Sequence, residues 1–242
     1  MYKRMSLHGN TINIVNNINV EKYLMMFNKC MKKMLVSIND CDIIMKVGVV
    51  FMDYEILVNK KNYIKSEEIP GNLVSVGKNE HPTISFGGET DEILLEETAA
   101  NWFNKMIEDC NSRHDNKIIP DSGYRSIKRQ ERLVKYYYDR DGEKAFTYVA
   151  PPRASEHHTG LAIDVALMIN GEYSDDITGE EEEIKDLQSI CYNYGYILRY
   201  PKGKEEITGY KYEPWHFRFV GLDLAKKIYD SGLTLEEIKQ TK

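Results

Sequence analysis

The sequence of 242 residues predicts an α+β fold, with a small central, mostly antiparallel sheet flanked by helices. Three observations support this class. Segments with the apolar period of helices gather early and late in the chain. Short alternating segments typical of strands lie between them. A hairpin is expected to lead into the last strand, which favours antiparallel pairing. An N-terminal appendage of helix and strand precedes this domain.

The first 52 residues differ from the rest, so we predict an appendage at 1–52 and a main domain at 53–242. Apolar residues recur at helical spacing behind Asn19, a suitable N-cap, and predict a helix near 20–36. Those residues are Val20, Leu24, Phe27, Met31 and Leu35. The mostly apolar run at 43–52 predicts a strand. The appendage could pack on the main domain or form a dimer contact, and the sequence does not decide.

Beyond residue 55 the chain is rich in loop signals, up to Gly87-Gly88. An apolar stripe then predicts a helix near 91–112, with acidic residues at its N-terminal end. Residues 118–126 predict a short strand that turns into a helix over 127–139. The later elements are a strand at 161–167, a helix near 180–194, strands at 195–199 and 215–220, and helices near 221–231 and 234–240.

Charge and composition exclude several classes. The formal net charge of -6 gives no electrostatic reason to expect a nucleic acid or an anionic membrane as partner. No apolar run is long enough to span a bilayer. The first residues lack the apolar core and cleavage site of a signal peptide, which predicts a cytoplasmic protein. An exported protein whose signal had been removed would look the same.

The cysteines are widely spaced, without a Cys-x-x-Cys pair. This spacing excludes a zinc ribbon and disfavours a disulfide framework in a chain of this length. We therefore expect buried free thiols. The four residues are Cys30, Cys41, Cys110 and Cys191.

Residues that could bind a metal are concentrated in the segments 155–164 and 213–216. A catalytic zinc typically takes three nitrogen or oxygen ligands and leaves a fourth position for water. The candidate ligands are His157, Asp164 and His216, with Glu213 as the base that takes a proton from that water. Spacing alone does not choose between His157 and the adjacent His158.

The local backbone supports the assignment of Asp164 and sets a condition on that of Glu213. The alternation of the strand at 161–167 places Asp164 and the small Ala162 on one face, away from the large aliphatic residues. Pro214 pushes Glu213 out of the helical region. Glu213 and His216 therefore converge only if the chain bends at Pro214 and Trp215.

Arg125 follows the predicted strand at a turn, where functional side chains are common. Its guanidinium could hold a substrate carboxylate or stabilise an oxyanion. The alternative is a surface arginine that caps the turn. Gln130 would lie on the following helix and carries no signal by itself.

These motifs resemble a known family. The pattern Ser-x-His-x-x-Gly-x-Ala-x-Asp at 155–164, followed by Glu-Pro-Trp-His at 213–216, is similar to the zinc D-alanyl-D-alanine peptidases of the VanY and VanXY type. Further similar motifs are Ser122-Gly123-Tyr124-Arg125-Ser126 with Gln130, and the stretch 193–209. The resemblance covers about residues 55–235 and leaves the first fifty residues outside.

The resemblance implies a role for each matching residue. His157, and not His158, matches the first metal ligand, with Asp164 and His216 as the other two. Glu213 matches the catalytic base. The remaining matches, which in the family hold the terminal carboxylate or help to polarise the scissile carbonyl, are Arg125, Gln130 and Ser155.

The implied activity is a zinc D,D-carboxypeptidase that releases the terminal D-Ala from peptidoglycan precursor peptides ending in D-Ala-D-Ala. The predicted cytoplasmic location is similar to the VanXY type, which also cleaves the free dipeptide and is tied to vancomycin resistance. An L,D-carboxypeptidase acting on tetrapeptides would share these motifs. A catalytically silent zinc-binding module is the alternative outside the enzymes, and the presence of Glu213 argues against it.

Overall fold

The computed structural model describes residues 4–7, 10–13, 52–65, 70, 72–79 and 91–240. The chain divides into two compact units, Met1–Met52 and Asp53–Lys242. In the first unit, β1 (Arg4–Leu7) and β2 (Asn10–Asn13) pair antiparallel. The predicted helix near 20–36, and all but the last residue of the strand predicted at 43–52, lie outside the described residues.

The second unit is built on an antiparallel sheet with the strand order β5-β6-β9-β8, and β7 also pairs with β6. This arrangement confirms the predicted α+β class with its small antiparallel sheet. The strands are β5 (Lys117–Ser122), β6 (Ala162–Ile169), β7 (Glu172–Ser174), β8 (Tyr196–Leu198) and β9 (His216–Phe219).

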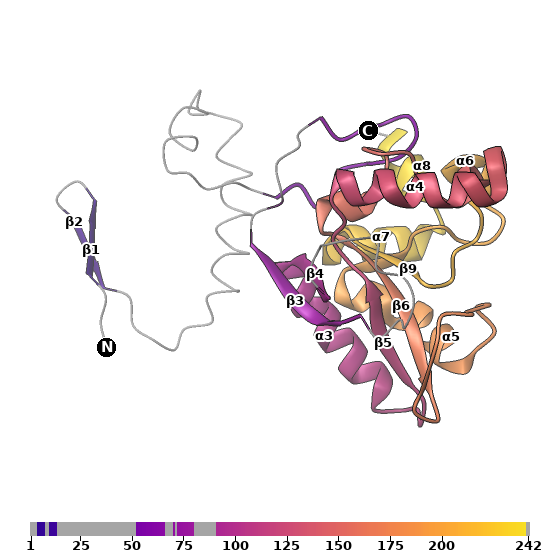
Figure 1. Ribbon diagram of the computed structural model, residues 1–242. Helices are drawn as coiled ribbons and strands as arrows, with labels where there is room; N and C mark the ends of the chain where they lie inside the picture. The colour runs from indigo at the N-terminus through magenta and orange to yellow at the C-terminus, as the bar shows by residue number, and fades with distance from the viewer. Residues whose placement is uncertain are drawn as a thin grey trace. The chain divides into compact units, whose positions relative to one another are not determined.

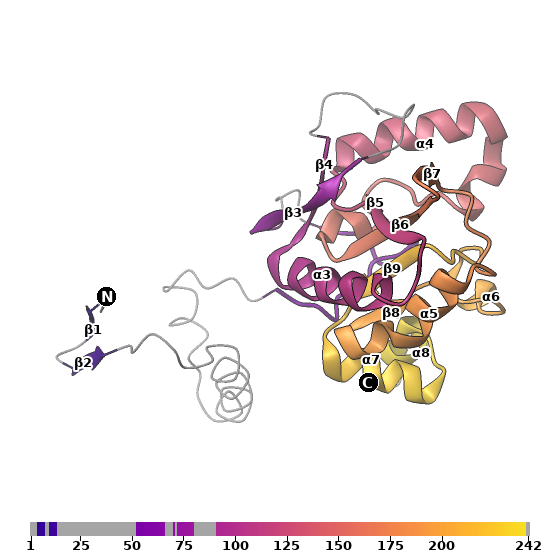
Figure 2. The ribbon, with the colours of Figure 1, turned by 90° about the horizontal axis from the view of Figure 1, so that it is seen from below.

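Helices cover the sheet on both sides (Figure 1). Figure 2 shows α4 on one side of β5 and β6, and α3, α5 and α7 on the other. The helices are α3 (Glu97–Asn111), α4 (Ile127–Asp141), α5 (Glu182–Ile190), α6 (Glu205–Thr208), α7 (Leu222–Ser231) and α8 (Leu235–Gln240), with single 3₁₀ turns η1 (Gly142–Thr147), η2 (Glu156–Thr159) and η3 (Cys191–Tyr194). None of the helices in the described part of the chain has the length and apolar character of a membrane span.

The predicted helix near 91–112 starts too early. Residues 92–96 form strand β4 (Glu92–Glu96), which pairs with β3 (Leu73–Lys78) in a region where we predicted loops. Ile93 and Leu95 are buried on this strand. The helix begins only at Glu97, because the Glu96 side chain accepts hydrogen bonds from the backbone N–H groups of Thr98 and Ala99.

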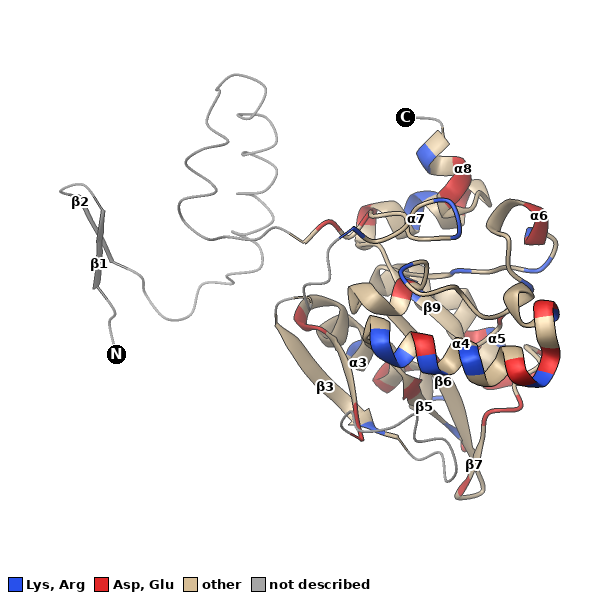
Figure 3. Ribbon diagram, turned by 45° about the horizontal axis from the view of Figure 1, so that its top comes forward, with Lys and Arg blue, Asp and Glu red and all other residues tan. Residues whose placement is uncertain are grey.

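The helix predicted at 127–139 is confirmed as α4. The Ser126 hydroxyl caps it by accepting a hydrogen bond from the backbone N–H of Arg129 at 3.0 Å. Figure 3 shows charges of both signs along α4. Gln130, in contrast, is only 1% exposed, and it is the polar residue that this helix turns toward the interior.

Candidate active site

A cavity of about 300 Å³ lies between α4 and the sheet. Every residue that the sequence singled out for the site lines this cavity. They are Arg125, Gln130, Ser155, His157, Asp164, Glu213 and His216. The structure therefore brings together residues that are up to 91 positions apart in the chain, from Arg125 to His216.

The three candidate metal ligands converge at one end of the sheet. Asp164 on β6 is the register partner of His216 on β9, and His157 comes from the turn η2. Asp164 Oδ1 lies 2.7 Å from His216 Nδ1, and Asp164 Oδ2 lies 3.2 Å from His157 Nε2. One ligand atom from each residue lies within 4.8 Å of the other two. Two imidazoles and a carboxylate at these distances fit a zinc ion.

The turn η2 separates the two adjacent histidines. His157 Nδ1 donates a hydrogen bond to the Gly123 carbonyl at 2.7 Å, which leaves Nε2 free to face Asp164. His158 instead accepts a hydrogen bond from the backbone N–H of Arg153 at Nε2, so that its Nδ1 donates to the Arg125 carbonyl. Because both ring nitrogens of His158 are bound to backbone, this residue holds the loop and has no nitrogen left for a metal.

Gly160 ends the turn η2 in the left-handed region, with φ of 69°. A Cβ atom at this position would lie 2.9 Å from Cδ2 of Leu73 and 3.3 Å from the backbone nitrogen of Glu96. The glycine of the motif therefore allows the turn to pack against the β3–β4 hairpin and directs His157 into the cavity.

The two candidate histidine ligands have pKa values shifted in opposite directions. Burial lowers the pKa of His157 to about 4, so this imidazole is neutral and can act as a ligand at neutral pH. Burial also lowers the pKa of His216, but the neighbouring Asp164 carboxylate outweighs this effect and the pKa rises to about 9. Burial raises the pKa of Asp164, but the two histidines outweigh this effect and hold the pKa well below its usual range.

The chain turns at Pro214 and Trp215, the condition under which we expected Glu213 and His216 to converge. The backbone N–H of His216 donates to the Glu213 carbonyl at 3.2 Å across this turn. Glu213 Oε2 then lies 3.9 Å from His216 Nδ1, at the edge of the ligand group. Burial, with a contribution from the Asp164 carboxylate, raises the pKa of Glu213 to about 8. A carboxyl group with a pKa in this range is suited to general acid and base chemistry near neutral pH.

Arg125 is held in the cavity rather than on the surface. Its Nη1 donates to Gln130 Oε1 and its Nη2 to Ser122 Oγ, both at 2.9 Å, and Nη2 lies 3.8 Å from Asp164 Oδ2. Gln130 Nε2 in turn donates to the Ala150 carbonyl at 2.7 Å, so this side chain holds the guanidinium in place. Ser155 is 4% exposed and lines the same cavity.

Sequence reasoning missed a buried charged group next to the ligands. Glu156, 1% exposed, forms ion pairs with Arg199 at 2.7 Å and Arg218 at 3.0 Å, and both arginines are almost fully buried. Arg199 also pairs with Glu236 of α8 at 2.6 Å. No local signal marks this group, because Glu156 and its partners lie on η2, β9, α8 and the end of β8.

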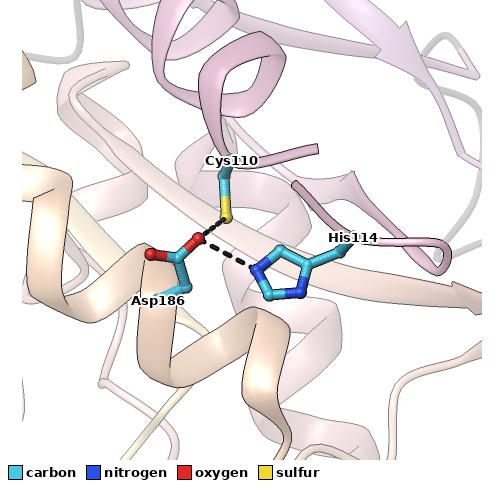
Figure 4. Close-up of side chains that lie close together, drawn as sticks. All are labelled: Cys110, His114 and Asp186. Carbon is cyan, nitrogen blue, oxygen red and sulfur yellow. Dashed lines mark hydrogen bonds and ion pairs between the residues drawn. The ribbon is translucent and has the colours of Figure 1, made fainter. Parts of the chain in front are cut away.

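A second set of possible ligands, Cys110, His114 and Asp186, joins the end of α3 to α5 (Figure 4). Asp186 Oδ2 lies 2.9 Å from His114 Nε2, 3.0 Å from Arg113 Nε and 3.5 Å from Cys110 Sγ. Burial and this carboxylate raise the pKa of Cys110 to about 12, so the thiol stays protonated. With its carboxylate already shared with an arginine, the group is a structural hydrogen-bond network. Cys110 and Cys191 are free and buried, as predicted.

Replacing Asp186 by asparagine is expected to lower the free energy of unfolding by about 1–3 kcal/mol, because Cys110, His114 and Arg113 lose the charged carboxylate that they share. The number of zinc ions bound per chain is expected to stay unchanged. Urea denaturation and metal analysis of the purified variant test both points. Loss of one bound zinc in Asp186→Asn would instead identify these residues as a metal site.

The cavity presents two imidazoles, a carboxylate between them and a further carboxylate beside them, which are the groups with which metal-dependent hydrolases activate water. The chain belongs to the VanY family, described as D-alanyl-D-alanine carboxypeptidase, whose family model matches residues 92–222. The family predicted from the motifs is therefore confirmed.

Two relatives illustrate the range of the family. The Bacillus subtilis protein YodJ is 39% identical over 184 residues, which cover 75% of this chain and 65% of YodJ. The match thus spans less than two thirds of that relative. The bifunctional D-Ala-D-Ala dipeptidase and carboxypeptidase VanXYC of Enterococcus gallinarum is 37% identical over 187 residues, covering 75% of this chain and 90% of VanXYC.

Solved structures show the same fold. The LD-carboxypeptidase LdcB superposes with a TM-score of 0.65 at 37% identity, covering 76% of this chain and 84% of LdcB. VanYB in complex with D-alanine-D-alanine gives 0.62 at 30% identity, covering 78% and 98%. A mutant of the D,D-pentapeptidase VanY from a VanB-type resistance cassette, in complex with Zn(II), gives 0.60 at 30% identity, covering 76% and 97%.

Proposed function

We propose that the protein is a zinc-dependent D,D-carboxypeptidase that hydrolyses the terminal D-Ala from peptidoglycan precursor peptides ending in D-Ala-D-Ala. The observation that carries this proposal is the convergence of His157, Asp164 and His216 beside Glu213 in one cavity. Family membership supports the carboxypeptidase activity. The VanY structure that holds Zn(II) supports the choice of metal.

Zinc held by His157, Asp164 and His216 would supply a Lewis acid and a water of lowered pKa. Glu213 takes a proton from the attacking water and passes it to the nitrogen of the leaving D-Ala. The water oxygen ends in the new carboxylate of the shortened peptide. The products are therefore a peptide shortened by one residue and free D-Ala.

Arg125 defines the end of the substrate that enters the cavity. Its guanidinium could bind the terminal carboxylate of the peptide, or stabilise the oxyanion that develops at the scissile carbonyl. Gln130 and Ser122 hold it at 2.9 Å each, so its orientation is set before the substrate binds. Ser155, on the wall of the cavity, is a further substrate contact in this proposal. A peptide bound across an internal bond would leave the Arg125 guanidinium without a carboxylate partner. The site would therefore disfavour cleavage of internal peptide bonds.

An L,D-carboxypeptidase that trims tetrapeptides is a second candidate function. Its support is specific: LdcB, an LD-carboxypeptidase, superposes on 76% of this chain at 37% identity. The ligand set, Glu213 and Arg125 would serve both reactions, because the two differ in the configuration of the residue before the scissile bond. The choice therefore depends on the part of the cavity that holds that residue.

The experiment that tests these proposals is D-Ala release from a muramyl pentapeptide ending in D-Ala-D-Ala, from the matching tetrapeptide and from the free dipeptide. Each substrate is incubated with the untreated enzyme, with enzyme treated with a chelator, and with treated enzyme resupplied with zinc. We expect release from the pentapeptide that the chelator abolishes and zinc restores. Additional activity on the free dipeptide would indicate the substrate range of the VanXY type.

The other outcomes lead to different conclusions. Release from the tetrapeptide alone would replace the D,D proposal by the L,D one. Zinc binding with no release from any of the three peptides would favour a silent zinc-binding module. Release that the chelator does not affect would contradict the metal assignment. The cytoplasmic location stays a prediction that cell fractionation can test.

A further inference from the structure

The two carboxylate oxygens of Glu156 have different neighbours: one faces two arginines and the other faces His216. Nε of Arg199 donates a hydrogen bond to Oε1 of Glu156 at 2.7 Å, and Nη1 of Arg218 forms an ion pair with the same oxygen at 3.0 Å. Oε2 is left without either of them and faces His216 Nε2 at 3.7 Å. Within the described part of the chain, Glu156 Oε2 and His216 Nε2 are both buried atoms without a hydrogen-bond partner.

The other ring nitrogen of His216 faces the proposed metal position. Nδ1 lies 2.7 Å from Asp164 Oδ1 and 3.9 Å from Glu213 Oε2, so the imidazole presents this edge to the ligand group. A metal-binding histidine commonly presents the N–H of its second nitrogen to a carboxylate, which fixes the tautomer and the orientation of the ring. His157 has the equivalent support from the Gly123 carbonyl, at 2.7 Å from Nδ1.

We propose that Glu156 is a positioning residue for the metal centre. Its carboxylate, held by Arg199 and Arg218, keeps the proton of His216 on Nε2 and thereby leaves the lone pair of Nδ1 for the metal. This inference rests on the proposed zinc site, and it adds a residue that acts on the metal through His216 and is not itself a proposed ligand.

Stability alone is a weak explanation for this network. Moving charged groups out of water costs free energy that their mutual attraction often fails to return, and apolar residues of similar volume can replace such groups without loss. The arginines also have other partners. Arg199 pairs with Glu236, and Nη2 of Arg218 donates to the carbonyls of Tyr54 and Ile56. Glu156 is the member of the network that also reaches a candidate ligand.

The test compares the zinc affinity of Glu156→Gln with that of the wild type, by competition with a chromophoric chelator. We expect the dissociation constant for zinc to rise by about 10- to 100-fold, the range found for residues that support metal ligands. The melting temperature of the chelator-treated protein is measured in parallel. It reports damage to the fold that does not involve the metal.

Glu236→Gln is the matched control. It removes a buried carboxylate from the same Arg199, but the Glu236 oxygens accept hydrogen bonds from Arg199 and Asn59 and do not face a candidate metal ligand. We expect it to lower the melting temperature of the metal-free protein while the zinc dissociation constant stays within about threefold of wild type. Glu156→Asp is a second variant, for use if Glu156→Gln does not fold. Its shorter side chain keeps the charge for the arginines but withdraws from His216, and it is also expected to bind zinc more weakly.

Two results would overturn the inference. One is a folded Glu156→Gln that binds zinc as tightly as wild type. The other is an equal loss of zinc affinity in Glu156→Gln and Glu236→Gln, which would make the network purely structural. The proposed function fails separately, if the wild type binds zinc but releases D-Ala from none of the peptides. Weaker zinc binding by Glu156→Gln would support the positioning role even then.

Discussion

Replacing Glu213 by glutamine is expected to lower kcat for release of the terminal residue by about 10²- to 10⁴-fold, the usual contribution of a general acid and base. Glutamine keeps the shape of the side chain but cannot take the proton of the attacking water. Zinc should remain bound, because Glu213 lies 3.9 Å from His216 Nδ1, outside the closer group formed by Asp164 and the two histidines. Steady-state kinetics and metal analysis of the same preparation check both expectations.

Glu206→Gln provides the control, because Glu206 is an exposed glutamate on α6 that does not line the cavity. It should leave kcat unchanged. If Glu213→Gln kept kcat within about threefold of wild type, the base would have to be another group. If it lost zinc together with activity, Glu213 would belong to the ligand set instead.

The second large effect is expected at Arg125. Replacing it by methionine should lower kcat/KM by about 10- to 150-fold, since a hydrogen bond to a charged group contributes about 1.5–3 kcal/mol. The more specific readout is selectivity between a peptide with a free terminal carboxylate and the same peptide with a terminal amide. The wild type should strongly prefer the free carboxylate, and Arg125→Met should lose most of that preference.

Arg125→Lys separates charge from geometry. Lysine keeps the positive charge but cannot reproduce the fork that holds Gln130 and Ser122 at once, so we expect an intermediate loss. The melting temperature of each variant shows whether the fold survives, because Arg125 also lies 3.8 Å from Asp164. An unchanged preference for the free carboxylate in Arg125→Met would mean that another group binds the substrate terminus.

The sequence by itself determined features that depend on neighbouring residues. The alternation of 161–167 placed Asp164 on the same face of β6 as the small Ala162, and the helix expected at 127–139 is α4. Pro214 kept Glu213 out of a helical backbone, and Glu213 Oε2 lies 3.9 Å from His216 Nδ1. In each case a local backbone preference, set within a few residues, was sufficient.

The tertiary structure decided what depends on distant partners. Glu92–Glu96 is a strand only because β3 pairs with it, and acidic residues that favour a helix start also fit this short strand. The backbone contacts of His158, which spacing could not distinguish from His157, became visible only with Arg125 and Arg153 in place. Glu156 acquires its contact with His216 from a strand 60 residues further on. Pairing and burial of charge join residues far apart in the chain, and local sequence patterns carry no record of them.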